Sequence, residues 1–483
     1  MQSRLFGFIL VFGVISSVFA GCFLAVNGQT SENTDVYVGI DVAYGANIEE
    51  IKSLVDQASS YTNLFVLGCT EITQNEVKLD EACQYLYDKG MYFIVYQEYP
   101  VGYIPHSTTN LNWPEKAKTR WGERFLGIYY LDESGGRQLD LAPKWVVVSR
   151  ADNYSDASRI FDNRIDYSVN WFRTNHFSST SFPMFMSDYA LYWFDYKGGY
   201  DVLLAQFGWN YSRQLNVALC RGAASVQNKD WGVMITWTYN EPPYIESGDE
   251  LYEDLVLAYD NGAKYIVIFN SNKEYTQGIL GDTHFDALKQ FWQYAHDNPR
   301  NAKPVEDRVA FVLPKDYAYG FRGPQDKIWG LWEADAFSLE LGRSIGNLLE
   351  EYGPALDIIY DDGLETNNTL MFNQLLRWDV YSPSSSPIPL PVPTSIQPPN
   401  TTLPPRWTWT SPSSSAYLTQ SPSESPLPQS TSSIEPQQTE IFSKNEVLPI
   451  AMVAVLVFAI VVVVSIYKKK NVPRVNQSNT PLR

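Results

Sequence analysis

Between about residues 35 and 300 the chain alternates short β-rich runs with longer amphipathic stretches, and no other feature constrains its fold as strongly. This alternation is typical of βα units on a parallel sheet. Eight strands are predicted, over Val36–Val42, Leu64–Leu67, Tyr92–Tyr96, Phe125–Leu131, Pro183–Ser187, Val202–Phe207, Gly232–Trp237 and Tyr265–Phe269. Helical patterns separate most of them, as in Ile48–Ser59, Leu79–Asp88, Asp156–Thr174, Leu215–Val226 and Leu251–Asn261. Eight such units in about 265 residues predict a (β/α)8 barrel, of the α/β class, over residues 35–300.

An open, doubly wound sheet is the alternative fold for such a pattern. It would place a glycine-rich phosphate loop after the first strand, but residues 41–45 read DVAYG. We therefore favour the barrel. Beyond it, residues 301–381 contain two strand-like runs, Arg308–Leu313 and Leu356–Tyr360, and a helical pattern at Ser338–Tyr352. This segment predicts a small α/β appendage packed on the barrel.

The first 28 residues have the layout of a signal peptide. An apolar run, Leu5–Ala20, follows Arg4 and ends in small residues, which indicates export and cleavage. Retention as a first membrane anchor is the alternative, because the run extends to Val26 and so approaches the ~20 residues that a span needs. Cys22 follows Phe-Ala-Gly, the pattern of a lipobox in which the cysteine is lipidated, although an ordinary cysteine explains it equally well.

A second apolar run, Val447–Tyr467, carries no charge and is long enough to cross ~30 Å of hydrocarbon as a helix. Lysines 468–470 follow it directly, so the positive-inside bias places residues 468–483 in the cytoplasm and the folded part outside. Residues 382–440, before this helix, are dominated by Ser, Thr and Pro, a composition that does not fold and favours an extended stalk. The sequence thus predicts a single-pass protein of the cell membrane with an extracellular folded domain.

Composition excludes several kinds of partner. The formal net charge of −18 argues against a nucleic-acid partner, whose phosphates require a basic surface. Only four cysteines occur, at 22, 69, 83 and 220, so the chain is no disulfide scaffold. The sequence does not decide whether Cys69 and Cys83 form a disulfide bond. No group of Cys and His has metal-ligand spacing, and we expect neither a zinc site nor another cofactor. N-glycosylation sequons stand on the predicted outer side at Asn153, Asn210, Asn367 and Asn400.

The residues after the predicted strands decide what the barrel binds, because active sites of such barrels lie at the carboxyl ends of the strands. Carboxylates, amides and aromatic rings gather there, without His, Cys or clustered Lys. This combination fits a carbohydrate, whose hydroxyls need polar partners and whose ring faces stack on Trp and Tyr, and it fits phosphate poorly. We expect substrate contacts from Asp41, Glu98, Asp132, Asp188, Trp209, Trp237, Tyr239 and Asn240.

A carboxylate pair after the fourth and seventh strands resembles the largest clan of (β/α)8 glycoside hydrolases. The matching residues are Glu133, in YYLDE at 129–133, and Glu241, in TWTYNE at 236–241. The resemblance implies that Glu133 is the acid/base and Glu241 the nucleophile of a retaining mechanism. The chain departs from the clan at Asp132, where an asparagine usually stands, and a carboxylate only accepts hydrogen bonds whereas an amide also donates them. Reserve carboxylates are Asp188, Glu98 and Asp41.

Two functions of different classes follow from these features. The first is a cell-surface glycoside hydrolase that cleaves an extracellular glycan without a cofactor. The second is a non-catalytic barrel that binds sugar or displays a surface, because a stalk and an anchor suit display as well as catalysis. A separation of ~5–5.5 Å between the Glu133 and Glu241 carboxyl groups would favour retention, ~6.5–9.5 Å inversion, and a much larger one binding.

Overall fold

The computed structural model describes residues 36–45, 47–97, 112–143, 147–176, 182–300, 308–362 and 371–380. The predicted signal peptide, stalk, membrane helix and tail lie outside these residues, as do Cys22 and Glu98. Within the described ranges, no helix is both long and apolar enough to cross a membrane.

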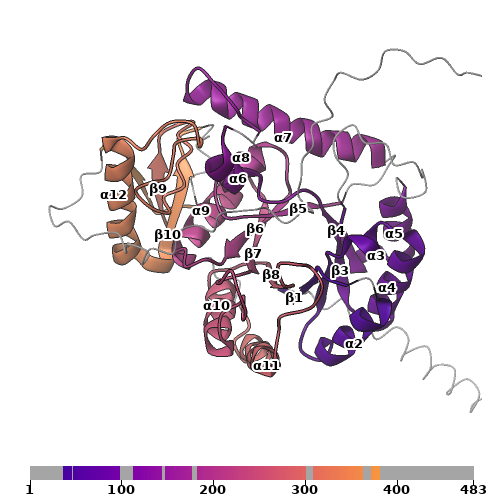
Figure 1. Cartoon of the computed structure of the whole chain (residues 1–483). Helices are drawn as coiled ribbons and strands as arrows, with labels where there is room; N and C mark the ends of the chain where they lie inside the picture. The colour runs from indigo at the N-terminus through magenta and orange to yellow at the C-terminus, as the bar shows by residue number, and fades with distance from the viewer. Residues whose placement is uncertain are drawn as a thin grey trace, which may run out of the picture. The chain divides into compact units, whose positions relative to one another are not determined.

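Eight parallel strands form a closed barrel in sequence order (Figure 1). The first strand pairs with the second and also with the eighth, where Asp41 lies opposite Phe269. This closing pair confirms the predicted (β/α)8 barrel, and the open doubly wound alternative is wrong. The strands are β1 (Tyr37–Val42), β2 (Leu64–Leu67), β3 (Tyr92–Tyr96), β4 (Phe125–Tyr129), β5 (Met184–Asp188), β6 (Val202–Phe207), β7 (Asp230–Ile235) and β8 (Tyr265–Asn270).

Some helices of the barrel begin at a polar residue whose side chain caps them. The side chain of Asn47 accepts a hydrogen bond from the main-chain N–H of Glu49. Ser247 and Glu250 form a reciprocal capping box at the start of another helix. Helical elements are α2 (Ile48–Ala58), α3 (Thr70–Thr73), α4 (Glu76–Asp88), α5 (Trp113–Trp121), η1 (Gly122–Arg124), α6 (Ser134–Leu141), α7 (Tyr154–His176), α8 (Tyr192–Lys197), α9 (Arg213–Val226), α10 (Gly248–Asp260) and α11 (Asp282–Asp297).

Alternate residues of the strands pack the inside of the barrel, because successive side chains of a strand point to opposite faces. Leu64 and Val66 of β2 and Val267 of β8 are fully buried members of this inner cluster. Phe185 of β5 meets Tyr265 of β8 edge-on, with the ring centroids 5.1 Å apart. The barrel is therefore filled by side chains, and a ligand reaches it only at an end.

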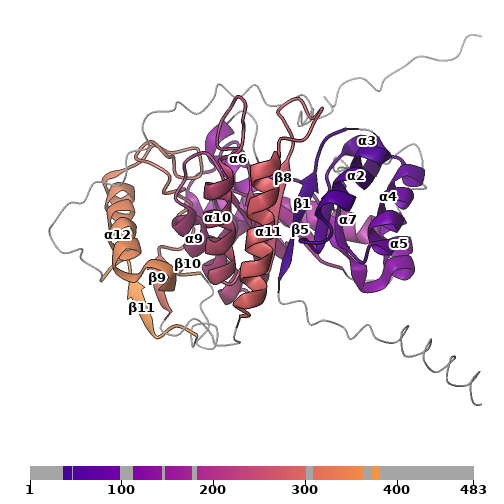
Figure 2. The same ribbon diagram turned by 90° about the horizontal axis from the view of Figure 1, so that it is seen from below.

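The residues after the barrel form a smaller parallel sheet in the order β10-β9-β11. It consists of β9 (Val309–Leu313), β10 (Leu356–Tyr360) and β11 (Gln374–Arg377), with α12 (Ala336–Tyr352) and the short turn η2 (Gly353–Ala355). β9, α12 and β10 lie where the sequence predicted strand, helix and strand. Strand β11 was not predicted, because its four residues show no apolar alternation. Figures 1 and 2 show β9, β10 and α12 on the side of the barrel where α9 lies.

Appendage and barrel belong to one compact unit, joined through α9. Gly222 of α9 lies so close to β10 that an added Cβ would stand 2.5 Å from the carbonyl oxygen of Ile358. The neighbouring Arg221 donates from Nε to the Asp357 carboxylate of β10 at 2.8 Å, and both side chains are buried. Arg308, at the start of β9, donates to the other oxygen of Asp357 at 2.6 Å.

The three cysteines in the described part of the chain are free and buried. The Cys69–Cys83 bridge that the sequence left open is therefore absent there. Stability rests on packing and on buried polar contacts.

Candidate active site

Glu133 and Asp132 lie at the mouth of the barrel, directly after β4. The N–H of Glu133 donates to the carbonyl of Ser187 at 3.0 Å, so the main chain continues beside β5 past the last residue of the strand. Leu131 and Glu133 both adopt left-handed backbone conformations, with φ of 60° and 55°. Such conformations are strained for non-glycine residues and concentrate at functional sites. The sharp turn carries the two carboxyl groups into the mouth.

Side chains from three neighbouring strands hold these carboxyl groups. The hydroxyl of Tyr129, in β4, contacts both Asp132 and the hydroxyl of Ser187. Ser187, in β5, also donates to Asp132 at 2.9 Å. Gln206, in β6, donates from Nε2 to Glu133 Oε1 at 2.9 Å and to the Ser187 hydroxyl at 3.0 Å. These five residues form one connected network, which we call the mouth network.

Burial raises the pKa of both acids in the mouth network. The pKa of Glu133 is raised mainly by loss of solvent, while the hydrogen bond from Gln206 and the charge of Arg137 oppose the shift. The pKa of Asp132 is raised well above its usual range by burial and then by the negative charge of Glu133 beside it. Two like charges this close do not both ionise readily, so the pair retains a proton above the usual carboxyl range. Such surroundings keep a carboxylic acid protonated, which a general acid requires.

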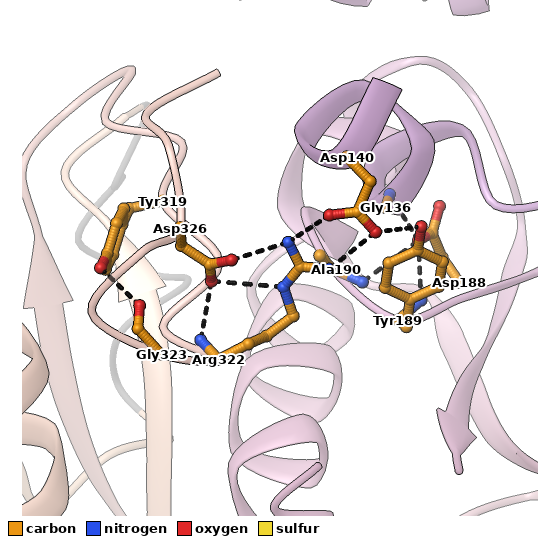
Figure 3. A network of polar contacts seen from close by, with 9 residues as sticks. All are labelled: Gly136, Asp140, Asp188, Tyr189, Ala190, Tyr319, Arg322, Gly323 and Asp326. Carbon is orange, nitrogen blue, oxygen red and sulfur yellow. Dashed lines mark hydrogen bonds and ion pairs between the residues drawn. The ribbon is translucent and has the colours of Figure 1, made fainter. Parts of the chain in front are cut away.

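Asp188, at the end of β5, lies against the start of α6 (Figure 3). Its oxygens accept hydrogen bonds from the main-chain N–H groups of Gly135 at 2.7 Å and Gly136 at 2.8 Å. They also accept from the N–H groups of Tyr189 at 2.7 Å and Ala190 at 3.1 Å. Burial raises the pKa of Asp188 to about 7 in spite of these bonds. Asp188, which the sequence predicted as a substrate contact, thus binds the start of α6, the helix that follows Glu133.

Trp237 is the centre of an aromatic cluster just beyond β7. Its ring lies edge-on to Trp209 at 6.4 Å and to Phe269 at 5.7 Å. Tyr244 and Tyr275 stand 6.1 Å and 6.4 Å from it. Trp209 and Trp237 are half-buried, and aromatic rings of this kind are surfaces on which sugar rings stack. The indole N–H of Trp237 donates to the carbonyl of Ser271 at 2.7 Å, which fixes its orientation.

Glu241 lies in the loop after β7 and does not join the mouth network. Its side chain is 72 % exposed and pairs with Lys273 at 2.6 Å. Among the described residues, no hydrogen bond or ion pair links Glu241 to Glu133 or to the partners of Glu133. Tyr239 and Asn240, in the same loop, are exposed and half-exposed respectively. The carboxylate pair expected after the fourth and seventh strands therefore comprises one half-buried acid in the mouth network and one ion-paired surface acid.

Asp41, like Asp188, is a predicted site residue that lies within a strand of the barrel. It lies in β1 opposite Val66 of β2 and is 6 % exposed. The neighbouring Gly68 leaves room for it, since an added Cβ there would stand 2.3 Å from Asp41 Oδ1. Asp41 is in register with Val66 and Phe269, which belong to the inner cluster, so its side chain points to the inside of the barrel near the carboxyl end of β1.

Sequence reasoning missed Tyr129, Ser187 and Gln206, which bind the two acids. Each is a hydrogen-bonding residue at or near the carboxyl end of a mainly apolar strand. A search for such residues at the carboxyl ends of the strands would have found them, because polar side chains inside a barrel need partners. In the described ranges, no three His, Cys, Asp or Glu residues are arranged to hold a metal ion.

No protein-family model matches the sequence, and a comparison with curated proteins finds no match. The structure is similar to a beta-galactosidase from Bacillus circulans sp. alkalophilus, with 11% identity over 71% of this chain and 67% of that one and a TM-score of 0.45. It is also similar to alpha-L-fucosidase isoenzyme 2 from Paenibacillus thiaminolyticus, with 11% identity over 70% and 59% of the two chains and a TM-score of 0.41. Type I 3-dehydroquinate dehydratase from Clostridium difficile shares 10% identity over 55% and 93%, with a TM-score of 0.28. The structural neighbours of this chain thus include glycoside hydrolases and a dehydratase. The barrel itself is established by the strand pairing.

Proposed function

We propose that this chain is a glycoside hydrolase in which Glu133 donates the proton to the leaving glycosidic oxygen. One observation carries the proposal: Glu133 is held by Gln206 at the barrel mouth, and burial raises its pKa. A general acid needs its proton at the working pH, and a carboxyl group meets that need only when its surroundings raise its pKa.

The substrate class follows from the aromatic cluster after β7, at the same end of the barrel as these acids. Trp209 and Trp237 offer half-buried indole faces, and apolar sugar faces stack on such rings. Asp132 can accept hydrogen bonds from sugar hydroxyls while it is ionised. Glu133 would then meet the oxygen that links this sugar to the rest of the glycan.

The second carboxylate decides the stereochemistry. Glu241 remains the nucleophile that the clan resemblance implies. For that role its side chain must leave Lys273 and move to about 5–5.5 Å from the carboxyl group of Glu133. Asp41 is the alternative, because its side chain points to the inside of the barrel near the carboxyl end of β1. Glu241→Gln and Asp41→Asn separate the two, since the nucleophile variant loses turnover on every glycoside that the wild type cleaves.

Glu133→Gln tests the proton donor. We expect a loss on the order of 10²–10⁴-fold on glycosides with poor leaving groups. An activated aryl glycoside needs little protonation, so in a retaining mechanism it should still form the glycosyl-enzyme and then stall, because no base activates water. Glu333→Gln is the matched control, as Glu333 is 79 % exposed and pairs with Lys327. Wild-type rates for Glu133→Gln on both substrates would refute the assignment.

A non-catalytic, sugar-binding barrel is the second candidate, and the ion pair of Glu241 with Lys273 favours it. In that case the mouth would bind glycans through the same tryptophans without cleaving them. Glycan binding by a wild-type protein that cleaves none of a broad panel of reporter glycosides would establish this function over the first.

We also propose that the folded domain is displayed outside the cell on a stalk. The uncharged run Val447–Tyr467 and the lysines that follow it support this location. A chain ended near Gln438 should leave the membrane fraction and be secreted. Continued membrane attachment that Cys22→Ala abolishes would show instead that a lipid on Cys22 holds the protein.

A further inference from the structure

Helix α6 starts at the residue after Glu133, and its own sequence does little to hold it in place. It is eight residues long, Gly135 and Gly136 lie in its first turn, and Glu133 provides no side-chain cap. Helices this short are unstable alone in water, and glycine weakens them further. The position of α6, and with it that of Glu133, therefore depends on contacts with other elements.

The appendage supplies such contacts to the carboxyl-terminal half of α6. Arg322, in the segment between β9 and α12, binds the carboxylate of Asp140 with two nitrogens, at 2.7 Å and 3.1 Å (Figure 3). The buried side chain of Gln138 donates to the carbonyl of Trp329 at 2.8 Å. Gly330 lies so close that an added Cβ would stand 2.2 Å from the carbonyl oxygen of Gln138. The appendage thus contacts the last turn of α6 at both Gln138 and Asp140.

Arg322 is itself held rigidly. Asp326 accepts hydrogen bonds from Nε of Arg322 at 3.2 Å and from Nη2 at 2.8 Å. The guanidinium lies 5.4 Å from the ring centre of Tyr189 and 5.7 Å from that of Tyr211. The Tyr189 hydroxyl donates to Asp140 at 2.8 Å, so the same tyrosine contacts both partners of the ion pair. The side chain of Arg322 is only 8 % exposed.

We propose that the appendage is part of the active site and that Arg322 is a positioning residue, which acts through Asp140 and α6 to hold Glu133 at the barrel mouth. The inference rests on the proposed function, in which Glu133 is the proton donor. Asp188 secures the first turn of the same helix, so α6 is fixed at both ends by residues outside it.

The charges around Glu133 make the proposal testable. The groups that face it are Asp132 beside it, Arg137 and Asp140 of α6, Asp188 and Tyr189 at the end of β5, and Gln206 of β6. The negative charge of Asp140 raises the pKa of Glu133. Arg322 neutralises that charge through the two-nitrogen contact. Removal of Arg322 and removal of the Asp140 charge should therefore move the pKa of Glu133 in opposite directions.

Three variants of the full chain test this role. Arg322→Met removes the clamp, and Asp140→Asn removes the charge while Arg322 keeps Asp326 and the two tyrosine rings. The control is Arg377→Met, since Arg377 also pairs with two aspartates of the appendage, Asp361 and Asp379, but is 42 % exposed. The pKa of Glu133 is measured by NMR with ¹³C-labelled glutamate, and its resonance is assigned from Glu133→Gln. The values of kcat and KM are measured on a glycoside with a poor leaving group.

Arg322→Met should raise the pKa of Glu133 and lower kcat on the order of 10- to 100-fold with little change in KM, because small misplacements of an acid have effects of this size. Asp140→Asn should lower the pKa of Glu133, a change that loss of stability alone does not produce. Arg377→Met should change neither quantity.

Wild-type pKa values and rates in both test variants would overturn the positioning role. If Arg322→Met fails to fold, Asp140→Asn decides alone, and an unchanged pKa of Glu133 in that variant refutes the proposal. If the wild type cleaves no glycoside, the proposed function has failed. The NMR titration then still decides whether Arg322 and Asp140 control Glu133.

Discussion

Asp357 should be among the residues on which the stability of the described unit depends most. Its side chain is fully buried in β10 between two arginines, Arg221 of α9 and Arg308 at the start of β9. Arg221 keeps contacts with Asn261 and with the carbonyl of Leu356 when the carboxylate is removed. Neither of those contacts carries a compensating charge. Asp357→Asn, which preserves the shape of the side chain, would therefore leave two guanidinium groups without their counter-ion.

Breaking a buried ion pair by removal of one partner lowers the free energy of unfolding by about 3–5 kcal/mol. We expect a loss of this size for Asp357→Asn in urea denaturation followed by tryptophan fluorescence. Asp286→Asn is the matched control, because Asp286 pairs with Lys289 on the surface, where the side chains are 62 % and 53 % exposed. That variant should unfold at the wild-type urea concentration.

A combined variant separates loss of the charge from loss of packing. Replacing Asp357 by Leu and both Arg221 and Arg308 by Met removes all three charges at once, and apolar replacement of a buried ionic group is often neutral or stabilising. This triple variant should be more stable than Asp357→Asn. If Asp357→Asn unfolds like the wild type, the two arginines do not depend on the carboxylate and the reasoning is wrong.

Three further outcomes follow from the described residues. Burial and the charge of Asp254 raise the pKa of Glu246 to about 8 from 4.5, so the folded state keeps a proton that the unfolded chain loses. The stability that this proton contributes below about pH 4.5 is therefore lost as pH rises through about 8. The midpoint of thermal unfolding should fall over this pH range, and less so in Glu246→Gln, whereas equal slopes in the two proteins would contradict the assignment. Ser247→Ala removes the capping box with Glu250 and should lower the free energy of unfolding by about 0.5–2 kcal/mol; an unchanged urea midpoint would count against the cap. Trp237→Ala should weaken glycan binding by up to roughly tenfold while the protein stays folded, measured by calorimetry; wild-type affinity would remove Trp237 from the site.

The barrel was predictable because the features that specify it are local. A period of two residues marks a strand, a period near 3.6 marks a helix, and the length of each segment limits the choice between them. Tyr92–Tyr96 and Val202–Phe207 were predicted with their observed bounds. The position of Glu133 at the barrel mouth was predictable for the same reason, because the residues that follow the strands of such a barrel all lie at one end of it. Strand β11 was missed because its four residues lack such a pattern.

The partners of each side chain were decided only by the tertiary structure. Gln206 reaches Glu133 from 73 residues away, and Arg322 reaches Asp140 from 182 residues away. Glu241, which the sequence placed in a pair with Glu133, pairs with Lys273 instead. Contacts of this kind depend on the register between strands and on the path of each loop, and local periodicity specifies neither. The sequence therefore determined the strands and the acids that follow them, and the packing of distant segments determined which side chains meet at the barrel mouth.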